Sequence, residues 1–208
     1  MSKEHSGRVT TRFGVIRHAQ TQWNVEKKIQ GQNDSPLTTA GLEQSRIWGG
    51  RLSGIKFDRI FSSDLGRTLS TAKGINQPLK LPVAATSRLR ELDWGSWTGK
   101  RLQEVKAKTP DVLKRMEKAG WQFCAPGGET REAVWQRARA ALLSATHRWP
   151  GETILTVTHE GVIKCLLYRL EKREFLPQEP ALILPYHLHW LVVRDRELAI
   201  EQINAIEL

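Results

Sequence analysis

The chain has 208 residues, of which 39% are hydrophobic and eight are Trp; this suits one α/β domain with an ordinary core and excludes a largely disordered chain. The formal net charge of +10 leaves three kinds of anionic partner open: nucleic acid, a membrane surface or an acidic small substrate. No apolar run approaches the roughly 18 residues of a membrane span, the first residues lack the apolar core of a signal peptide, and the two Cys form no CxxC pair. We therefore expect a cytoplasmic protein with no membrane partner, disulfide framework or zinc site.

Apolar runs alternate with helical patterns along the chain, after a polar tail over about residues 1–10. Short runs predict strands at 12–16, 58–61, 81–85, 153–159, 188–193 and 198–203, the last two as a hairpin. Apolar residues at helical spacing predict helices after Thr38, after 62–64, over 129–148 and through 162–170. This order predicts an α/β fold, a three-layer α/β/α sandwich with a mostly parallel central sheet.

The first two helices have expected caps and expected inward faces. Thr38 is the expected N-cap of the first helix, and the segment 62–64 is expected to cap the second. The residues expected to face the core are Leu42, Ser45, Trp48 and Leu52 in the first helix, and Leu65, Leu69, Ala72 and Ile75 in the second.

Residues 88–128 interrupt the alternation of strands and helices. They hold a loop rich in Trp and Gly at 94–99 and basic helical patterns broken at Thr109–Pro110. We expect a small cap inserted over the sheet, within a single domain that spans 1–208. The basic residues of 88–118 form either a solvated helical surface or a rim that attracts anionic substrates.

Two histidines stand where apolar strands end. His18 follows the strand at 12–16, and His159 ends the strand that begins at 153. Because chemistry in open α/β sheets gathers at the carboxyl ends of the strands, both imidazoles are expected at one rim, with Arg17 beside them. A neutral imidazole is a nucleophile toward phosphorus, and Arg matches phosphate oxygens. The pattern indicates a nucleophile in an anion-binding pocket, although an Arg-His pair alone is more often structural.

Five segments together resemble the histidine phosphatase (phosphoglycerate mutase-like) superfamily. They are Arg17–Asn24 with Pro36-Leu37-Thr38, Ser62–Ala72, Leu89–Gly99, Pro126–Thr130 and Val157-Thr158-His159, in the family's order. The resemblance spans about residues 13–165. It implies a phosphohistidine enzyme that acts on a small phosphorylated substrate.

The resemblance also implies roles for individual residues. His18 would attack phosphorus, and Glu91 would act as general acid and then as base. The groups expected to bind the phosphoryl oxygens are Arg17, Asn24, Arg67 and His159. Taken singly, Arg67 could instead be a solvated helical residue, and Glu91 could form a surface salt bridge with Arg90.

The surrounding substrate pocket is less sharply defined by the sequence. Its candidate residues are Gln30, Trp94, Trp97, Glu129 and Glu160. With Trp121, the tryptophans would either line a site for an apolar or nucleoside-like leaving group or pack as ordinary core. We expect no cofactor and no metal, and His187 and His189 are expected to be structural.

Two residues depart from the family's pattern. Ala19 stands where the family has Gly, which costs little if the backbone φ there is negative. Glu160 follows the second histidine, and its carboxylate must point away from the phosphate or be paired, because two anions repel.

The branch of the family follows from the segment after Glu91. Mutases of the family resemble one another in an Arg-His-Tyr-Gly run and a longer cap, whereas this chain has 92–97 as Leu-Asp-Trp-Gly-Ser-Trp. It therefore resembles the phosphatases, such as α-ribazole phosphatases and broad-specificity phosphatases. Two alternatives stay open: a phosphoglycerate mutase, and a weakly catalytic phosphate- or nucleic-acid-binding module supported only by the net charge. A homodimer also stays open.

Overall fold

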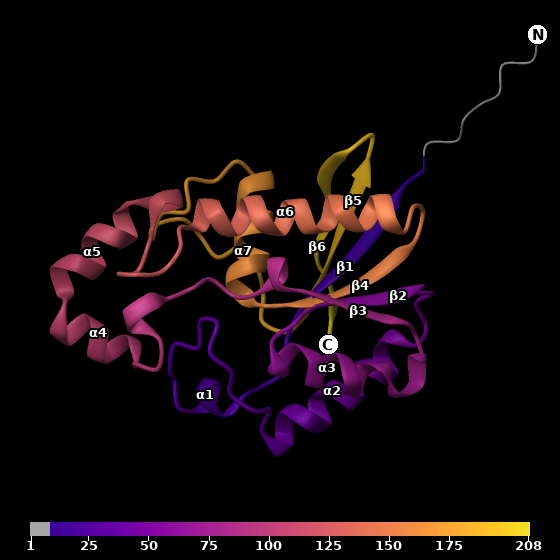
Figure 1. Ribbon diagram of the computed structural model, residues 1–208, viewed down its shortest axis with the longest axis horizontal. Coiled ribbons are helices and arrows are strands. Elements are labelled where there is room, and N and C mark those ends of the chain that lie inside the picture. The colour runs from indigo at the N-terminus through magenta and orange to yellow at the C-terminus, as the bar shows by residue number, and fades with distance from the viewer. Residues whose placement is uncertain (1–8) are drawn as a thin grey trace, which may run out of the picture.

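A computed structural model describes residues 9–208, and its centre is a six-stranded sheet of order β3-β2-β4-β1-β5-β6 (Figure 1). The strands are β1 (Thr11–Arg17), β2 (Arg59–Ser63), β3 (Val83–Thr86), β4 (Thr153–Thr158), β5 (His187–Arg194) and β6 (Glu197–Glu207). Strands β1 to β4 are parallel, and β5 and β6 form the antiparallel hairpin. The predicted mostly parallel sheet is thus confirmed; residues 1–8 of the predicted tail lie outside the described part.

Helices cover both faces of the sheet and make the three predicted layers. Their bounds are α1 (Gln22–Val25), α2 (Thr39–Leu52), α3 (Gly66–Leu79), α4 (Leu102–Lys108), α5 (Pro110–Lys118), α6 (Arg131–Arg148) and α7 (Glu160–Leu170). Figure 1 shows α2 and α3 on one face and α6 and α7 on the other. Strand residues alternate between these layers: Phe13 and Val15 pack with α6 and α7, whereas Ile16 packs with α2 and α3. Within residues 9–208, no helix has the length and apolar character to cross a membrane.

The segment between β3 and α6 breaks the strand–helix alternation. It contains the short 3₁₀ turns at Ser87–Leu89, Gly95–Trp97 and Gly120–Gln122, together with α4 and α5. Helix α5 begins at Pro110, directly after the predicted break, because Pro lacks the N–H that a helix interior needs. Both helices lie at the left of Figure 1, away from the sheet.

Most of the side chains predicted to face the core from the first two helices are buried: Ser45, Trp48, Leu52, Leu65, Ala72 and Ile75. Thr38 caps α2 as predicted, accepting a hydrogen bond from Gly41 N at 2.9 Å. Leu42 and Leu69, however, are 44% and 38% exposed. The two helices also come close at Gly49, where a Cβ would lie only 2.6 Å from the carbonyl oxygen of Ile75.

The predicted cap of α3 is also wrong. Ser62 and Ser63 belong to β2, and the N-cap position is held by Leu65, whose side chain offers no acceptor. The first amides of α3 instead donate to the carboxylate of Asp34, in the loop that follows β1.

Adjacent glycines in α2 give a matched test of this packing. We expect Gly49→Ala to lower the free energy of unfolding by about 1–3 kcal/mol, because the added methyl overpacks the contact with α3. Gly50→Ala should raise it by about 0.5–1 kcal/mol, since nothing lies within 4 Å of the added carbon and Ala is the better helix former. Urea denaturation measures both variants, and equal effects would contradict the close approach.

Candidate active site

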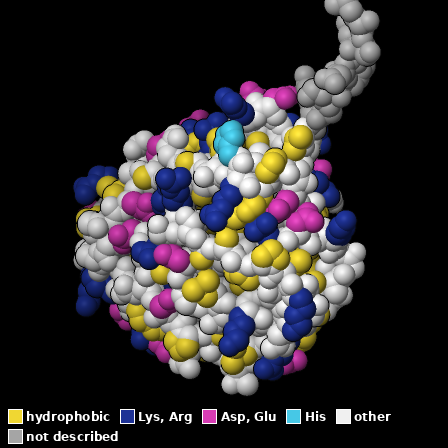
Figure 2. Space-filling model, turned by 45° about the vertical axis from the view of Figure 1, so that its right-hand side comes forward, with side chains coloured by type: hydrophobic (Ala, Val, Ile, Leu, Met, Phe, Trp, Pro, Cys, Tyr) yellow, Lys and Arg dark blue, Asp and Glu magenta, His cyan; other side chains and the backbone are white. Residues whose placement is uncertain are grey.

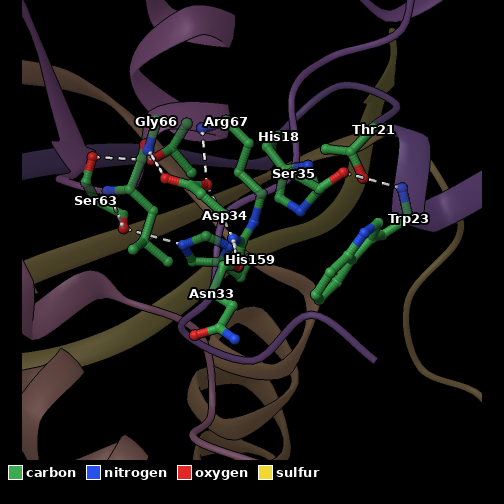
Figure 3. Close-up of polar contacts among 12 residues, drawn as sticks. His18, Thr21, Trp23, Asn33, Asp34, Ser35, Ser63, Gly66, Arg67 and His159 are labelled. Carbon is green, nitrogen blue, oxygen red and sulfur yellow. Dashed lines mark hydrogen bonds and ion pairs between the residues drawn. The ribbon is translucent and has the colours of Figure 1, made fainter. Parts of the chain in front are cut away.

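The carboxyl ends of β1 and β4 bring the two histidines together. The strands pair in parallel with Arg17 opposite Thr158, and His18 N donates to the Thr158 carbonyl at 2.9 Å. The imidazole centroids of His18 and His159 are 5.3 Å apart, and both rings are buried (Figure 3). The rim predicted from the two strand ends therefore exists in the structure.

His18 is held as a neutral imidazole with one defined tautomer. Its Nδ1 lies 2.8 Å from the carbonyl oxygen of Ala19, and because a carbonyl only accepts, Nδ1 carries the hydrogen. The lone pair is therefore on Nε2. Burial, followed by the charges of Arg17 and Arg67, lowers the pKa of His18 well below its ordinary value. Ala19 has no positive φ, so its methyl brings no backbone strain.

His159 is also neutral, and its ring contacts Ser63. Its Nε2 lies 3.0 Å from Ser63 Oγ, which also accepts from Leu65 N at 3.3 Å. In the tautomer with the ring hydrogen on Nδ1, Nε2 accepts the Ser63 hydroxyl hydrogen and Nδ1 is the donor. This Nδ1 is buried without a partner among the described residues, as a donor for an anion would be. Burial, followed by the charge of Arg67, lowers the pKa of His159 well below its ordinary value.

Arg67 crosses from α3 to the loop that follows β1. Its guanidinium donates to the carbonyls of Asn33 (2.7 Å) and Gly31 (2.6 Å) and pairs with Asp34 Oδ1 (3.1 Å). Asp34 also accepts hydrogen bonds from the first amides of α3, at Gly66 and Arg67 (Figure 3). Arg67 is only 1% exposed, so it is not the solvated helical residue of the alternative interpretation.

The carboxylate of Glu91 contacts the first turn of α7, which begins directly after His159. This carboxylate accepts from Leu92 N at 2.8 Å and from Gly161 N at 3.3 Å. Burial raises the pKa of Glu91, although these amides and the charge of Arg67 oppose the shift. A Cβ on Gly161 would lie 2.3 Å from Glu91 Oε1, so only Gly leaves room there. The sequence analysis missed this requirement, since nothing in the local pattern pairs 91 with 161.

The surface salt bridge considered for Glu91 does not form. Arg90 instead binds Asp64 with two hydrogen bonds of 2.7 Å, so the side chains at 90 and 91 point to different partners. The backbone of Glu91 is held from another direction, because Arg137 donates to its carbonyl at 3.0 Å.

Glu129 supports the Glu91 loop and does not line the pocket, which corrects the prediction. It accepts from Asp93 N at 2.9 Å and pairs with Arg137 at 2.6 Å. Since Arg137 binds the Glu91 carbonyl, Glu129 acts on that loop through a half-buried ion pair that no local sequence pattern reveals.

These side chains surround a pocket of about 120 Å³. Its lining residues are Arg17, His18, Asn24, Lys28, Ile29, Gln30, Gly31, Arg67, Glu91 and Trp94. Most of them were predicted; Lys28, Ile29 and Gly31 were not, because they lie in a loop without periodicity. His159 is buried beside His18 and does not line the pocket.

Trp97 is a packing residue, which corrects its prediction as a pocket residue, and for Trp121 the packing alternative holds. Trp97 is 3% exposed and lies edge-on to Phe123, with centroids 6.3 Å apart. Trp121 lies edge-on to Phe175 at 5.2 Å. Of the three candidate tryptophans, only Trp94 lines the pocket. Its ring also lies edge-on to Phe123, with centroids 5.4 Å apart.

Asn24 and Glu160 have defined partners. Asn24 Oδ1 accepts from the amide and the hydroxyl of Thr21, both at 3.0 Å, so its amide nitrogen is the remaining donor beside the pocket. Glu160 is paired, as its place next to an anion site requires: it binds Arg17 at 2.5 Å and Lys164 at 2.6 Å. Burial alone would raise the pKa of Glu160, but these two charges outweigh it and lower the pKa.

The late histidines take no part in a metal cluster among the described residues. His189 Nδ1 accepts from Asn204 N at 3.1 Å, and burial lowers its pKa to about 4. His187 Nδ1 lies 2.7 Å from the Pro185 carbonyl.

This fold and this rim of imidazoles and guanidinium groups agree with the comparison to known proteins. The chain belongs to the histidine phosphatase superfamily (branch 1), whose family model matches residues 13–206. A Salmonella choleraesuis protein named probable phosphoglycerate mutase GpmB is 36% identical over 153 residues, 74% of this chain and 71% of that protein.

Solved structures of the family superpose over nearly the whole chain. Bacillus stearothermophilus YhfR gives a TM-score of 0.86 at 30% identity, covering 95% of this chain and 98% of that one. A mycobacterial glucosyl-3-phosphoglycerate phosphatase gives 0.79 at 29% identity, covering 95% and 100%.

The capping role of Asp34 can be measured directly. We expect Asp34→Ala to lower the free energy of unfolding by about 1–2 kcal/mol, because the first amides of α3 lose their acceptor and Arg67 loses its carboxylate. Asp64→Ala is the matched control, and its half-exposed pair with Arg90 should contribute less than about 1 kcal/mol. A larger loss for the control in urea denaturation would contradict this assignment.

Proposed function

We propose that the protein hydrolyses phosphate monoesters of a small metabolite through a phosphohistidine on His18. The observation that carries the proposal is the lone pair of His18 Nε2 at a pocket that also holds Arg17 and Arg67. A neutral nucleophile beside two guanidinium groups suits an anionic phosphoryl group, since the cations bind its oxygens and disfavour protonation of the imidazole.

In the first step His18 Nε2 forms a bond to phosphorus while the bond from phosphorus to the ester oxygen breaks. Glu91 gives its proton to that departing oxygen. Its raised pKa supports this role, because a carboxyl must be protonated to act as an acid. In the second step the ionised Glu91 takes a proton from water, which attacks phosphorus and releases His18 and phosphate.

Donors around the pocket balance the charge that develops on the phosphoryl oxygens. Arg17 and Arg67 supply guanidinium donors and Asn24 supplies an amide, all from the lining of the pocket. His159 does not line the pocket, but its ring lies beside His18 and its buried Nδ1 has no partner among the described residues, so it would reach the phosphoryl oxygens only after a shift of the ring. These groups need no metal ion, because they provide the positive charge that a metal would supply.

Hydrolysis is favoured over mutase activity by the sequence after Glu91 and by the similarity to a structure named as a phosphatase. The mutase alternative is supported by the relative named as a phosphoglycerate mutase. Binding of nucleic acid has weaker support, because Figure 2 shows Lys and Arg scattered among Asp and Glu on the face in view, not gathered into one basic surface.

One experiment separates these functions. The wild-type protein should release phosphate from p-nitrophenyl phosphate and show little interconversion of 3- and 2-phosphoglycerate. Phosphohistidine is hydrolysed by acid, so the reaction with a substrate labelled in its phosphate is quenched at alkaline pH, where the intermediate survives. The His18→Ala variant should lose both the label on the protein and the turnover. Efficient interconversion with negligible phosphate release would establish the mutase instead.

Glu91→Gln tests the general acid. We expect a loss of about 100-fold or more in kcat/KM with alkyl phosphates, whose alcohols leave poorly, and a much smaller loss with p-nitrophenyl phosphate, whose leaving group needs no proton. Equal losses for both substrates would show that Glu91 does not protonate the leaving oxygen.

The pH profile follows from the same groups. Activity requires neutral His18, whose pKa is lowered, and protonated Glu91, whose pKa is raised. We expect kcat/KM to fall as the pH drops through the pKa of His18 and to fall again as it rises through that of Glu91. In Glu91→Gln the fall on the alkaline side should disappear; a profile unchanged from the wild type would contradict the assignment.

Glu160→Gln tests whether the unusual carboxylate belongs to the mechanism. We expect turnover to change by less than about tenfold, because the carboxylate is bound by Arg17 and Lys164 and an amide oxygen can still accept one of these hydrogen bonds. A larger loss would show that this side chain takes part in the reaction.

A further inference from the structure

A second and larger hollow, of about 620 Å³, lies next to the phosphate-sized pocket. It is bounded by α7, by the segment 171–186 and by the first residues of β5. Arg17 lines both hollows, and Glu160 lines the larger one. None of the roles proposed so far uses this space.

The sheet explains why the two hollows adjoin. Strand β5 runs antiparallel to β1, with His189 opposite Val15, so the beginning of β5 lies at the end of β1 that carries Arg17. The nucleophile follows Arg17 on the same rim. A substrate whose phosphate lies beside Arg17 can therefore extend across this residue toward β5.

The walls of the larger hollow are mainly apolar. Ile163 comes from α7, and Leu182 and Leu184 come from the segment before β5; Leu184 is 54% exposed. The cations of the hollow already have partners in the protein: Arg17 and Lys164 pair with Glu160, and Arg131 donates to the carbonyls of Gly120 and Phe175. Such a surface favours an apolar group over a second phosphate or carboxylate.

The aromatic side of the hollow is held rigidly. Phe175 stacks on Tyr168 with centroids 4.5 Å apart, and the Arg131 guanidinium lies 4.0 Å from the Phe175 ring and donates to its carbonyl at 3.0 Å. Phe175 and Tyr186 have φ values of +65° and +56°, which bulky residues rarely adopt. Both strained residues line the hollow, and strain of this kind persists where the surrounding structure enforces it, commonly at binding sites.

We propose that this hollow binds the alcohol part of the substrate, so that the preferred substrates are phosphate monoesters of large apolar alcohols. The inference rests on the proposed function, since the phosphate must occupy the pocket beside His18. Shared walls, apolar lining and preformed aromatic packing together carry the proposal.

Two esters with leaving alcohols of similar acidity test the preference. We expect kcat/KM for 2-(2-naphthyl)ethyl phosphate to exceed that for ethyl phosphate by at least about tenfold, which equals about 1.4 kcal/mol. Ala181 is exposed and lines the hollow, so Ala181→Trp should fill it and lower this ratio by about fivefold or more. Ala140→Trp is the matched control, because Ala140 is exposed on α6 outside both hollows, and its ratio should equal that of the wild type.

Binding of phosphonates separates this proposal from the proposed function, because they cannot be hydrolysed. Calorimetry should show tighter binding of 2-naphthylmethylphosphonate than of methylphosphonate, and Ala181→Trp should reduce the difference. Phosphate release from both esters without a preference, together with equal phosphonate binding, would overturn this inference and leave the proposed function standing. Tighter binding of the naphthyl phosphonate without any hydrolysis of the esters would contradict the proposed function and support the apolar site. If Ala181→Trp changes only the sedimentation of the protein, a second copy of the chain covers the hollow and the inference fails.

Discussion

The site is organised around a buried positive charge, the guanidinium of Arg67. Removing a cation from water is expensive unless it gains hydrogen bonds and an opposite charge. Here two loop carbonyls and Asp34 supply them, and the same contacts hold the loop after β1 against the beginning of α3. The shape of the phosphate-sized pocket follows, because Arg67 and Gly31 of that loop both form its wall.

The neutral state of the histidines follows mainly from burial, and the charge of Arg67 adds to it. Burial and Arg67 both lower the pKa of His18 and of His159, and Arg17 also lowers that of His18, so neither ring readily takes up a proton. For Glu91 the two effects oppose each other, and burial is the stronger. One buried environment thus favours neutral imidazoles and a protonated carboxyl, which are the forms that a phosphoryl transfer with an acid catalyst requires.

Glu160 shows how an anion is tolerated at the edge of an anion site. Its charge is taken up by Lys164 one turn along α7 and by Arg17 at the end of β1. The ion pair also forms part of the boundary between the small polar pocket and the large apolar one. Without this carboxylate Arg17 would lose that partner, so Glu160 shapes the surface that joins the two hollows as well as its charge.

Much of the fold could be predicted from the sequence, because it depends on interactions within a few residues. Alternating apolar runs, the Thr38 cap and the break at Pro110 act locally, and each appears in the structure where expected. The meeting of His18 and His159 could also be predicted, since parallel strands place their carboxyl ends at one edge.

Only the tertiary structure decided the features that join segments distant in the chain. The acceptor that caps α3 comes from Asp34, more than thirty residues before it, instead of the expected segment 62–64. Glu129 supports the Glu91 loop, Trp97 packs in the cap, and Leu42 faces outward. Residue spacing specifies which side chains share a face of one element, but which elements press together depends on packing across the whole core, and no local pattern contains that information.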